Sequence, residues 1–152
     1  MSSIPELVSG LFCDNDKEAY KCLKELIFAS EKDSGVYQFF DTFAEMIDSD
    51  SSYVRTRGLL LISANAKWDT DNRFDEIIDK YLRHIMDEKP ITARQCIKAL
   101  PDIAKYKPDL VAVIIAALNK ADPQRYSDSM QSLIYNDIKA ALKAISALHI
   151  VE

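Results

Sequence analysis

Six basic side chains in two segments of the chain are the candidates for contact with a partner. They are Arg55, Arg57, Lys67, Arg94, Lys98 and Lys105. At about 100° per residue on a helix, Arg94, Lys98 and Lys105 fall on one face, opposite an apolar face. Guanidinium and ammonium groups in such a row suit an acidic protein, RNA or a phosphate group. The sequence therefore predicts a cationic binding surface.

The charge is unevenly distributed along the chain, which supports that prediction. Residues 89–107 hold five positive side chains and one negative, whereas residues 1–52 hold four positive and eleven negative. The net charge of −5 argues against a dedicated nucleic-acid binder. A structural alternative is that the lysines form a solvated face, while Arg55 and Arg94 pair with carboxylates of a neighbouring repeat. We favour this structural reading for the lysines as well as for the two arginines.

Other chemical patterns are weak. His84, Asp87 and Glu88 could offer metal ligands one turn apart, but the chain has no HxxH or HExxH motif. The three cysteines have no CxxC spacing and are expected to be reduced thiols acting as small hydrophobic residues. We therefore expect no metal, cofactor or catalytic constellation.

The elements that must position these side chains are helices with one apolar face. Ser3 caps a short first helix, and the second runs from Asp14–Asp16 to about Glu31. The later helices are expected at about 36–47, 53–67, 70–85, 90–106, 108–118 and 127–148. Thr70 is the expected cap of the fifth, and Tyr20 and Leu133 are expected to face the core.

Three of these helices repeat one pattern at a spacing of 36 to 38 residues. Cys22-Leu23 aligns with Gly58-Leu59 and with Cys96-Ile97. The partner helices repeat too, because a shift of 38 residues carries the apolar face of 36–47 onto that of 74–85. A period of this length is typical of stacked helix pairs, each of which cannot bury its apolar face alone.

The segments 52–61 and 90–101 carry a family resemblance. Val54-Arg55 opens a helix with small and apolar residues behind it, as does Ala93-Arg94 before Ala99-Leu100-Pro101. In this the chain resembles HEAT repeats and a family of small bacterial HEAT-like proteins without an established activity. The resemblance implies an all-α fold: a short α-solenoid of about three helical hairpins with terminal capping helices, forming a single domain over residues 1–152.

The function that this architecture favours is a non-enzymatic protein-interaction or scaffold module with a partly basic surface. The alternative is nucleic-acid binding, or base-excision chemistry of the kind found in DNA glycosylases built from HEAT-like repeats. Trp68 next to Asp69, with Tyr106 at the matched place of the next repeat, would be the residues to consider, but their matched positions favour packing at the turns between helices. The first residues lack a signal-peptide pattern, and the longest apolar run, 110–118, is too short to cross a membrane. We therefore expect a cytoplasmic protein with a protein partner. The oligomeric state is left open.

Overall fold

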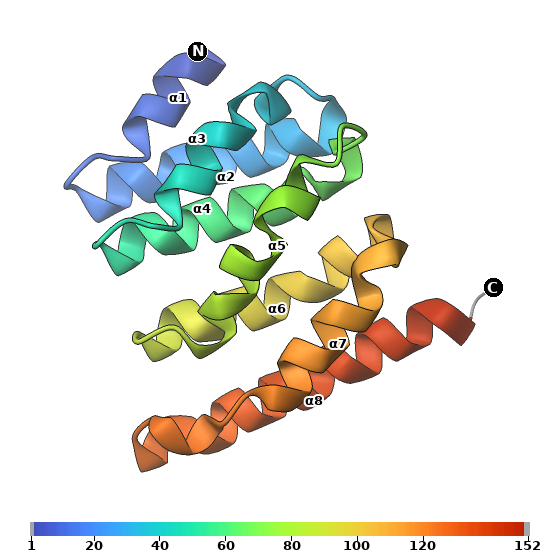
Figure 1. Cartoon of the computed structure of the whole chain (residues 1–152). Coiled ribbons are helices and arrows are strands. Elements are labelled where there is room, and N and C mark those ends of the chain that lie inside the picture. The colour runs from blue at the N-terminus through green and yellow to red at the C-terminus, as the bar shows by residue number, and fades with distance from the viewer. Residues whose placement is uncertain (1, 151–152) are drawn as a thin grey trace. The chain divides into compact units, whose positions relative to one another are not determined.

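The fold is all-α, as the sequence predicts. A computed structural model describes residues 2–150, in which eight α-helices and five short 3-10 helices occur and no strand is found (Figure 1). The contacts divide the chain into two compact units, Met1–Arg73 and Phe74–Glu152. None of the described helices combines the length and apolarity that a membrane span requires.

The first unit contains four α-helices and two 3-10 helices. They are α1 (Ile4–Gly10), α2 (Asp16–Lys32), η1 (Val36–Phe39), α3 (Phe40–Met46), α4 (Ser52–Ala64) and η2 (Ala66–Trp68). The side chains of Ser3, Asn15 and Ser51 cap α1, α2 and α4, each accepting a hydrogen bond from a backbone N–H three residues later. The predicted cap at Ser3 is therefore confirmed.

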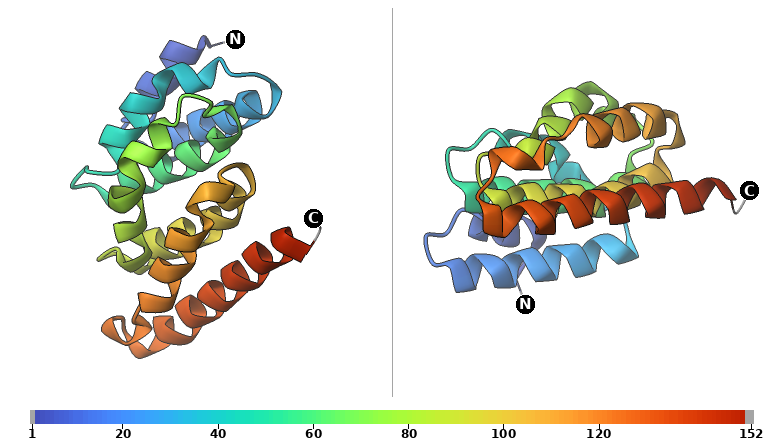
Figure 2. Two further views of the ribbon diagram at one scale, coloured as in Figure 1. Left: turned by 45° about the vertical axis from the view of Figure 1, so that its right-hand side comes forward. Right: turned by 90° about the horizontal axis from the view of Figure 1, so that it is seen from below.

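Within this unit α2 and α4 lie side by side and run in the same direction, while α3 returns against α4 (Figures 1 and 2). The fully buried side chains include Leu11, Leu26, Phe40, Phe43, Leu59 and Ile62. Gly58 permits the close crossing of α3 and α4. A Cβ atom at this position would lie 2.8 Å from Met46 Cβ and 2.9 Å from the Phe43 carbonyl oxygen.

Two local predictions in this unit are wrong. Tyr20 was expected in the core but is 58% exposed, because α2 presents only the narrower stripe of Ala19, Leu23 and Leu26 to its neighbours. Thr70 does not cap the fifth helix. That helix starts at Arg73, whose backbone N–H donates to Asp69 Oδ1 at 2.9 Å.

The second unit contains the remaining helices. They are α5 (Arg73–Leu82), η3 (Arg83–Met86), α6 (Pro90–Tyr106), η4 (Pro108–Leu110), α7 (Val111–Lys120), η5 (Pro123–Arg125) and α8 (Asp128–Ile150). The unit begins at Phe74, the second residue of α5. Helices α6 and α8 lie side by side in the same direction, and α7 returns between them in sequence (Figures 1 and 2). The fully buried side chains include Phe74, Tyr81, Ile97, Leu100, Ile103, Ile114, Ile134 and Ile145.

Cys96 occupies in α6 the position that Gly58 occupies in α4. Its thiol donates to the Tyr81 carbonyl oxygen at an Sγ–O distance of 3.7 Å. Tyr81 precedes Cys96 by the same fifteen residues that separate Phe43 from Gly58. In both units a small residue of one helix thus meets the matched carbonyl of the helix before it. Leu133 of α8, expected in the core, is 40% exposed, so that prediction is wrong.

A buried hydrogen bond joins the first unit's 3-10 helix η1 to the end of η2. The Tyr37 hydroxyl donates to Asp69 Oδ1 at 2.5 Å, and both residues are buried. Burial, and then this hydrogen bond, raises the pKa of Tyr37, so its hydroxyl remains a donor.

Replacing Tyr37 with Phe removes a donor from a buried carboxylate and is expected to lower the free energy of unfolding by about 1.5–3 kcal/mol. Tyr20→Phe is the matched control, because Tyr20 is exposed, and it is expected to change stability by less than about 0.5 kcal/mol. Urea unfolding of the full chain measures both. Equal midpoints for the two variants would contradict the structural role assigned to the Tyr37 hydroxyl.

Candidate interaction surface

The exposed face of α6 carries two of the six predicted basic residues. Lys98 and Lys105 are exposed and lie seven residues, or about two helical turns, apart. Ile91 lies seven residues before Lys98 and is 68% exposed. Lys105 Nζ lies 5.4 Å from the centre of the Tyr106 ring, which is itself 43% exposed. These four residues, called the α6 row below, offer cations and apolar surface together.

The α6 row has a modest positive surplus. Asp102 is exposed and lies within about one turn of both lysines, so it offsets part of their charge. Within residues 2–150 neither Lys98 nor Lys105 forms an ion pair with a carboxylate. Both ammonium groups are therefore available to a partner's carboxylates.

Arg94 also lies on α6 but is engaged within the second unit. Its Nε donates to Asp137 Oδ2 at 2.6 Å and its Nη2 to Oδ1 at 3.4 Å, which joins α6 to α8. The Asp137 side chain is only 11% exposed. The hydrogen bond to Asp137 raises the pKa of Arg94. Arg94 thus pairs with a carboxylate, as the structural reading expects, and that carboxylate lies on α8, the helix predicted as the C-terminal cap.

A second cation of this segment is also neutralised. Lys107 is buried, and its Nζ lies 3.0 Å from Asp75 Oδ1. Of the five cations between residues 89 and 107, Lys89, Lys98 and Lys105 are exposed. The usable charge on this face is therefore smaller than the sequence count indicates.

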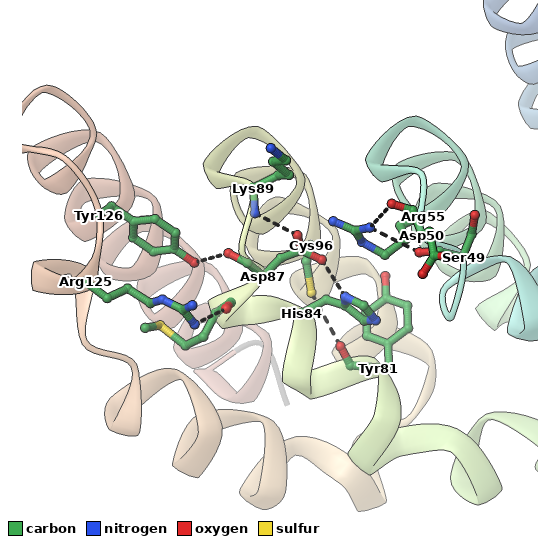
Figure 3. Close-up of polar contacts among 11 residues, drawn as sticks. Ser49, Asp50, Arg55, Tyr81, His84, Asp87, Lys89, Cys96, Arg125 and Tyr126 are labelled. Atoms are coloured by element: carbon green, nitrogen blue, oxygen red, sulfur yellow. Dashed lines mark hydrogen bonds and ion pairs between the residues drawn. The ribbon is translucent and has the colours of Figure 1, made fainter. Parts of the chain in front are cut away.

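In the first unit, Arg55 is buried near the start of α4. Its Nη1 donates to the carbonyl oxygens of Ser49 and Asp50, each at 3.1 Å, in the turn that precedes the helix (Figure 3). The side chain thus fastens this turn to the first turn of α4. Satisfying two backbone carbonyls is a structural task for a guanidinium group, which carries several fixed donors.

Arg57 is buried as well, and its contacts lie on the other side of the first unit. Its Nη1 donates to the Leu11 carbonyl oxygen at 2.9 Å, and its Nη2 lies 3.3 Å from Asp16 Oδ1. Arg57 therefore ties α4 to the segment between α1 and α2. The apolar run after Gly58 indicates that this helix is buried on most sides, but no signal in the sequence identifies the partners of Arg57, which lie more than 40 residues away in the chain.

Lys67 is half-buried in η2, with Nζ 5.9 Å from the centre of the Trp68 ring. Trp68 Nε1 donates to the Ser30 carbonyl oxygen at 2.7 Å, across 38 residues. Asp69 is buried and accepts from Tyr37 and Arg73. Trp68 and Asp69 are therefore used inside the first unit, whereas Tyr106, at the matched position of the next repeat, is exposed.

A polar cluster lies at the turn before α6. The sequence points to its residues His84 and Asp87 but not to Arg125 and Tyr126. Asp87 is buried; its Oδ2 lies 2.7 Å from His84 Nδ1, and its Oδ1 accepts from the Lys89 backbone N–H at 2.9 Å (Figure 3). The Tyr126 hydroxyl donates to the Asp87 carbonyl oxygen at 2.6 Å. Arg125 likewise donates to the Met86 carbonyl oxygen at 2.6 Å.

This cluster closes the turn before α6 in the way that Asx turns do. The hydrogen bonds from Arg125 and Tyr126 each span 39 residues, about one repeat length. His84, Asp87 and Glu88 were considered as metal ligands, but no group of three His, Cys, Asp or Glu side chains suited to a metal ion occurs among the described residues. The contacts of this cluster hold the start of α6 in place, and with it the residues of the α6 row.

Comparisons of the chain with protein-family models, with curated proteins and with solved structures gave no match.

The Arg94–Asp137 pair gives a test that separates structural from partner-binding cations. Arg94→Ala leaves the poorly exposed Asp137 carboxylate without its guanidinium and is expected to lower the free energy of unfolding by about 1–3 kcal/mol. Lys98→Ala, one turn later and exposed, is expected to change it by less than about 0.5 kcal/mol. Chemical denaturation measures both. Equally mild effects would show that the pair does not hold α6 to α8.

Proposed function

We propose that the chain is a protein-interaction module that acts in the cytoplasm, and that the α6 row is its contact surface. The observation that carries this proposal is that Lys98 and Lys105 are exposed without an ion-pair partner beside the exposed Ile91 and Tyr106. Exposed apolar side chains rimmed by charge mark protein-binding surfaces. The partner is expected to present carboxylates next to apolar residues.

The proposed architecture is a short α-solenoid of HEAT-like helix pairs. Two observations support it: first helices of successive pairs run parallel within each unit, and small residues at Gly58 and Cys96 meet matched carbonyls. Stacks of this kind bind partners through the side chains that packing leaves outside. On α6 those are the α6 row and Asp102.

The other predicted basic residues have structural tasks in this proposal. Arg55 and Arg57 are buried and bonded to backbone carbonyls, and Arg94 is paired with Asp137. Lys67 lies against Trp68. The binding role is accordingly assigned to Lys98 and Lys105 alone. Nucleic-acid binding is retained as an outcome of the test, since the same two lysines would contact phosphates.

The proposal predicts that reversing both charges, in Lys98→Glu with Lys105→Glu, weakens retention of a cytosolic protein partner by about tenfold or more, which corresponds to about 1.4 kcal/mol. Lys120→Glu with Lys143→Glu is the matched control, because it makes the same charge change at two exposed lysines on α7 and α8. Immobilised chains are exposed to nuclease-treated cytosol, and binding is then measured with the purified partner. Equal retention by both variants would contradict the assignment of the α6 row.

The nucleic-acid alternative is tested directly with fluorescent single-stranded and duplex DNA and RNA at low salt and at about 0.15 M salt. The proposed function predicts no saturable binding at the higher salt. Saturable binding that falls steeply with salt and disappears in the Lys98→Glu, Lys105→Glu variant would replace the protein partner with a nucleic acid.

A further inference from the structure

Two of the three cysteines neighbour Gly10, at the corner between α1 and α2. Gly10 is the last residue of α1, and the backbone N–H of Cys13 donates to its carbonyl oxygen at 3.2 Å. Cys22 of α2 packs on the same glycine, because a Cβ atom built at Gly10 would lie 2.4 Å from Cys22 Sγ. The backbone of Cys13 is thus bonded to the residue on which the Cys22 side chain packs, although nine positions separate the two cysteines in the sequence.

Their common neighbour, Gly10, is the geometric basis for a disulfide between them. The hydrogen bond from Cys13 to Gly10 closes a turn, and residues at the two ends of such a turn have Cα atoms less than about 7 Å apart. Since Cys22 Sγ lies beside Gly10, the Cys13 side chain must span about the width of this turn to reach it.

The pKa of Cys22 agrees with a position near Cys13. Burial is the main cause that raises the pKa of Cys22, followed by the charges of Glu25, Glu18 and Cys13. Cys13 is exposed and Cys22 is half-buried, so an oxidant reaches Cys13 first. Cys13 also lies outside both helices, between α1 and the Asn15 cap of α2, where no helical ladder fixes its backbone.

We propose that Cys13 and Cys22 are a redox modification site that closes an intramolecular disulfide in the presence of hydrogen peroxide. The Cys13 thiolate attacks one peroxide oxygen, the O–O bond breaks, and a sulfenic acid and hydroxide form. The Cys22 sulfur then attacks the Cys13 sulfur and displaces its hydroxyl group as water. Overall, two thiols and one peroxide give one disulfide and two water molecules, and a dithiol reductant reverses the reaction.

The bridge would fasten the end of α1 to α2. Helix α1 buries Leu7 and Val8, with Leu11 just beyond its end, so its attachment to the first unit is small. Closing the bridge removes freedom from the unfolded chain and is expected to raise the melting temperature by several degrees. This inference is independent of the proposed function, because it concerns the first unit and not the α6 row.

Cys96 is an internal control for the same reagent. It is fully buried in α6, its thiol donates to the Tyr81 carbonyl oxygen, and burial raises its pKa. It is therefore expected to stay reduced in the folded chain. Alkylation of Cys96 before denaturation would reveal unfolded protein in the sample.

The test is peptide mapping of the folded, full-length chain after treatment with a small excess of hydrogen peroxide and alkylation of the remaining thiols. Trypsin cleaves after Lys17 and Lys21, so Cys13 and Cys22 fall in different peptides. The expected product is a monomer in which these peptides are joined and have lost two hydrogens, while Cys96 is alkylated only after denaturation. Reduction with a dithiol should separate the joined peptides.

Two variants make the result decisive. In Cys22→Ser, Cys13 is expected to accumulate as a sulfenic acid that a dimedone probe labels, and in Cys13→Ser, Cys22 is expected to resist peroxide. The proposal is overturned if the wild-type chain yields only Cys13 sulfinic acid or Cys13-linked dimers while Cys22 remains alkylatable. It is also overturned if the Cys13→Ser variant is oxidised at Cys22 as fast as the wild type.

Discussion

The close crossing of consecutive helices at one small residue is the constraint on which the rest of the structure depends. At Gly58 the backbone of α4 approaches the Phe43 carbonyl so closely that a methyl group would not fit. At Cys96 the thiol itself contacts the equivalent carbonyl, that of Tyr81. Helices that approach at such distances bring their apolar faces into full contact, which is where most of the stability of a helical unit originates. The size of one side chain in each helix therefore sets how the neighbouring helices bury their cores.

That packing also decides which polar groups remain for a partner. Once the helices are close, side chains at the turns satisfy backbone groups of the previous pair: Trp68 reaches Ser30, and Tyr126 reaches Asp87. The arginines are used in the same way, because a guanidinium group can satisfy carbonyls or a carboxylate that packing has removed from water. Lys107 is used in this way too, since it is buried against Asp75, whereas Lys98 of α6 stays outside, where its ammonium group keeps its hydration. The proposed binding role thus falls to charges that folding does not use.

The sequence predicted the helices well because their signals are local. Caps such as Ser3 and the spacing of apolar residues predict the ends of each helix to within a few residues. The repeat identifies Gly58 and Cys96 as equivalent positions for small residues. Side-chain roles were less predictable, since they depend on contacts between distant residues. Tyr20 carries an apolar ring at a helical stripe position but lies outside the contact area. Arg57 is buried because it bonds to the Leu11 carbonyl oxygen and lies near Asp16, partners more than 40 residues away that local sequence does not reveal. The surface predicted from the sequence accordingly includes arginines that are buried or paired within their own unit.

The sign of the stability change in Gly58→Ala tests the central constraint most directly. In an unconstrained helix, alanine stabilises the chain relative to glycine by about 0.5–1 kcal/mol. Here the added methyl group would lie 2.8 Å from Met46 Cβ and 2.9 Å from the Phe43 carbonyl oxygen. The account predicts that Gly58→Ala lowers the free energy of unfolding by about 1–3 kcal/mol, measured by urea denaturation of the full chain. An increase in that free energy would show that α3 and α4 are not held at this distance, and would contradict the account.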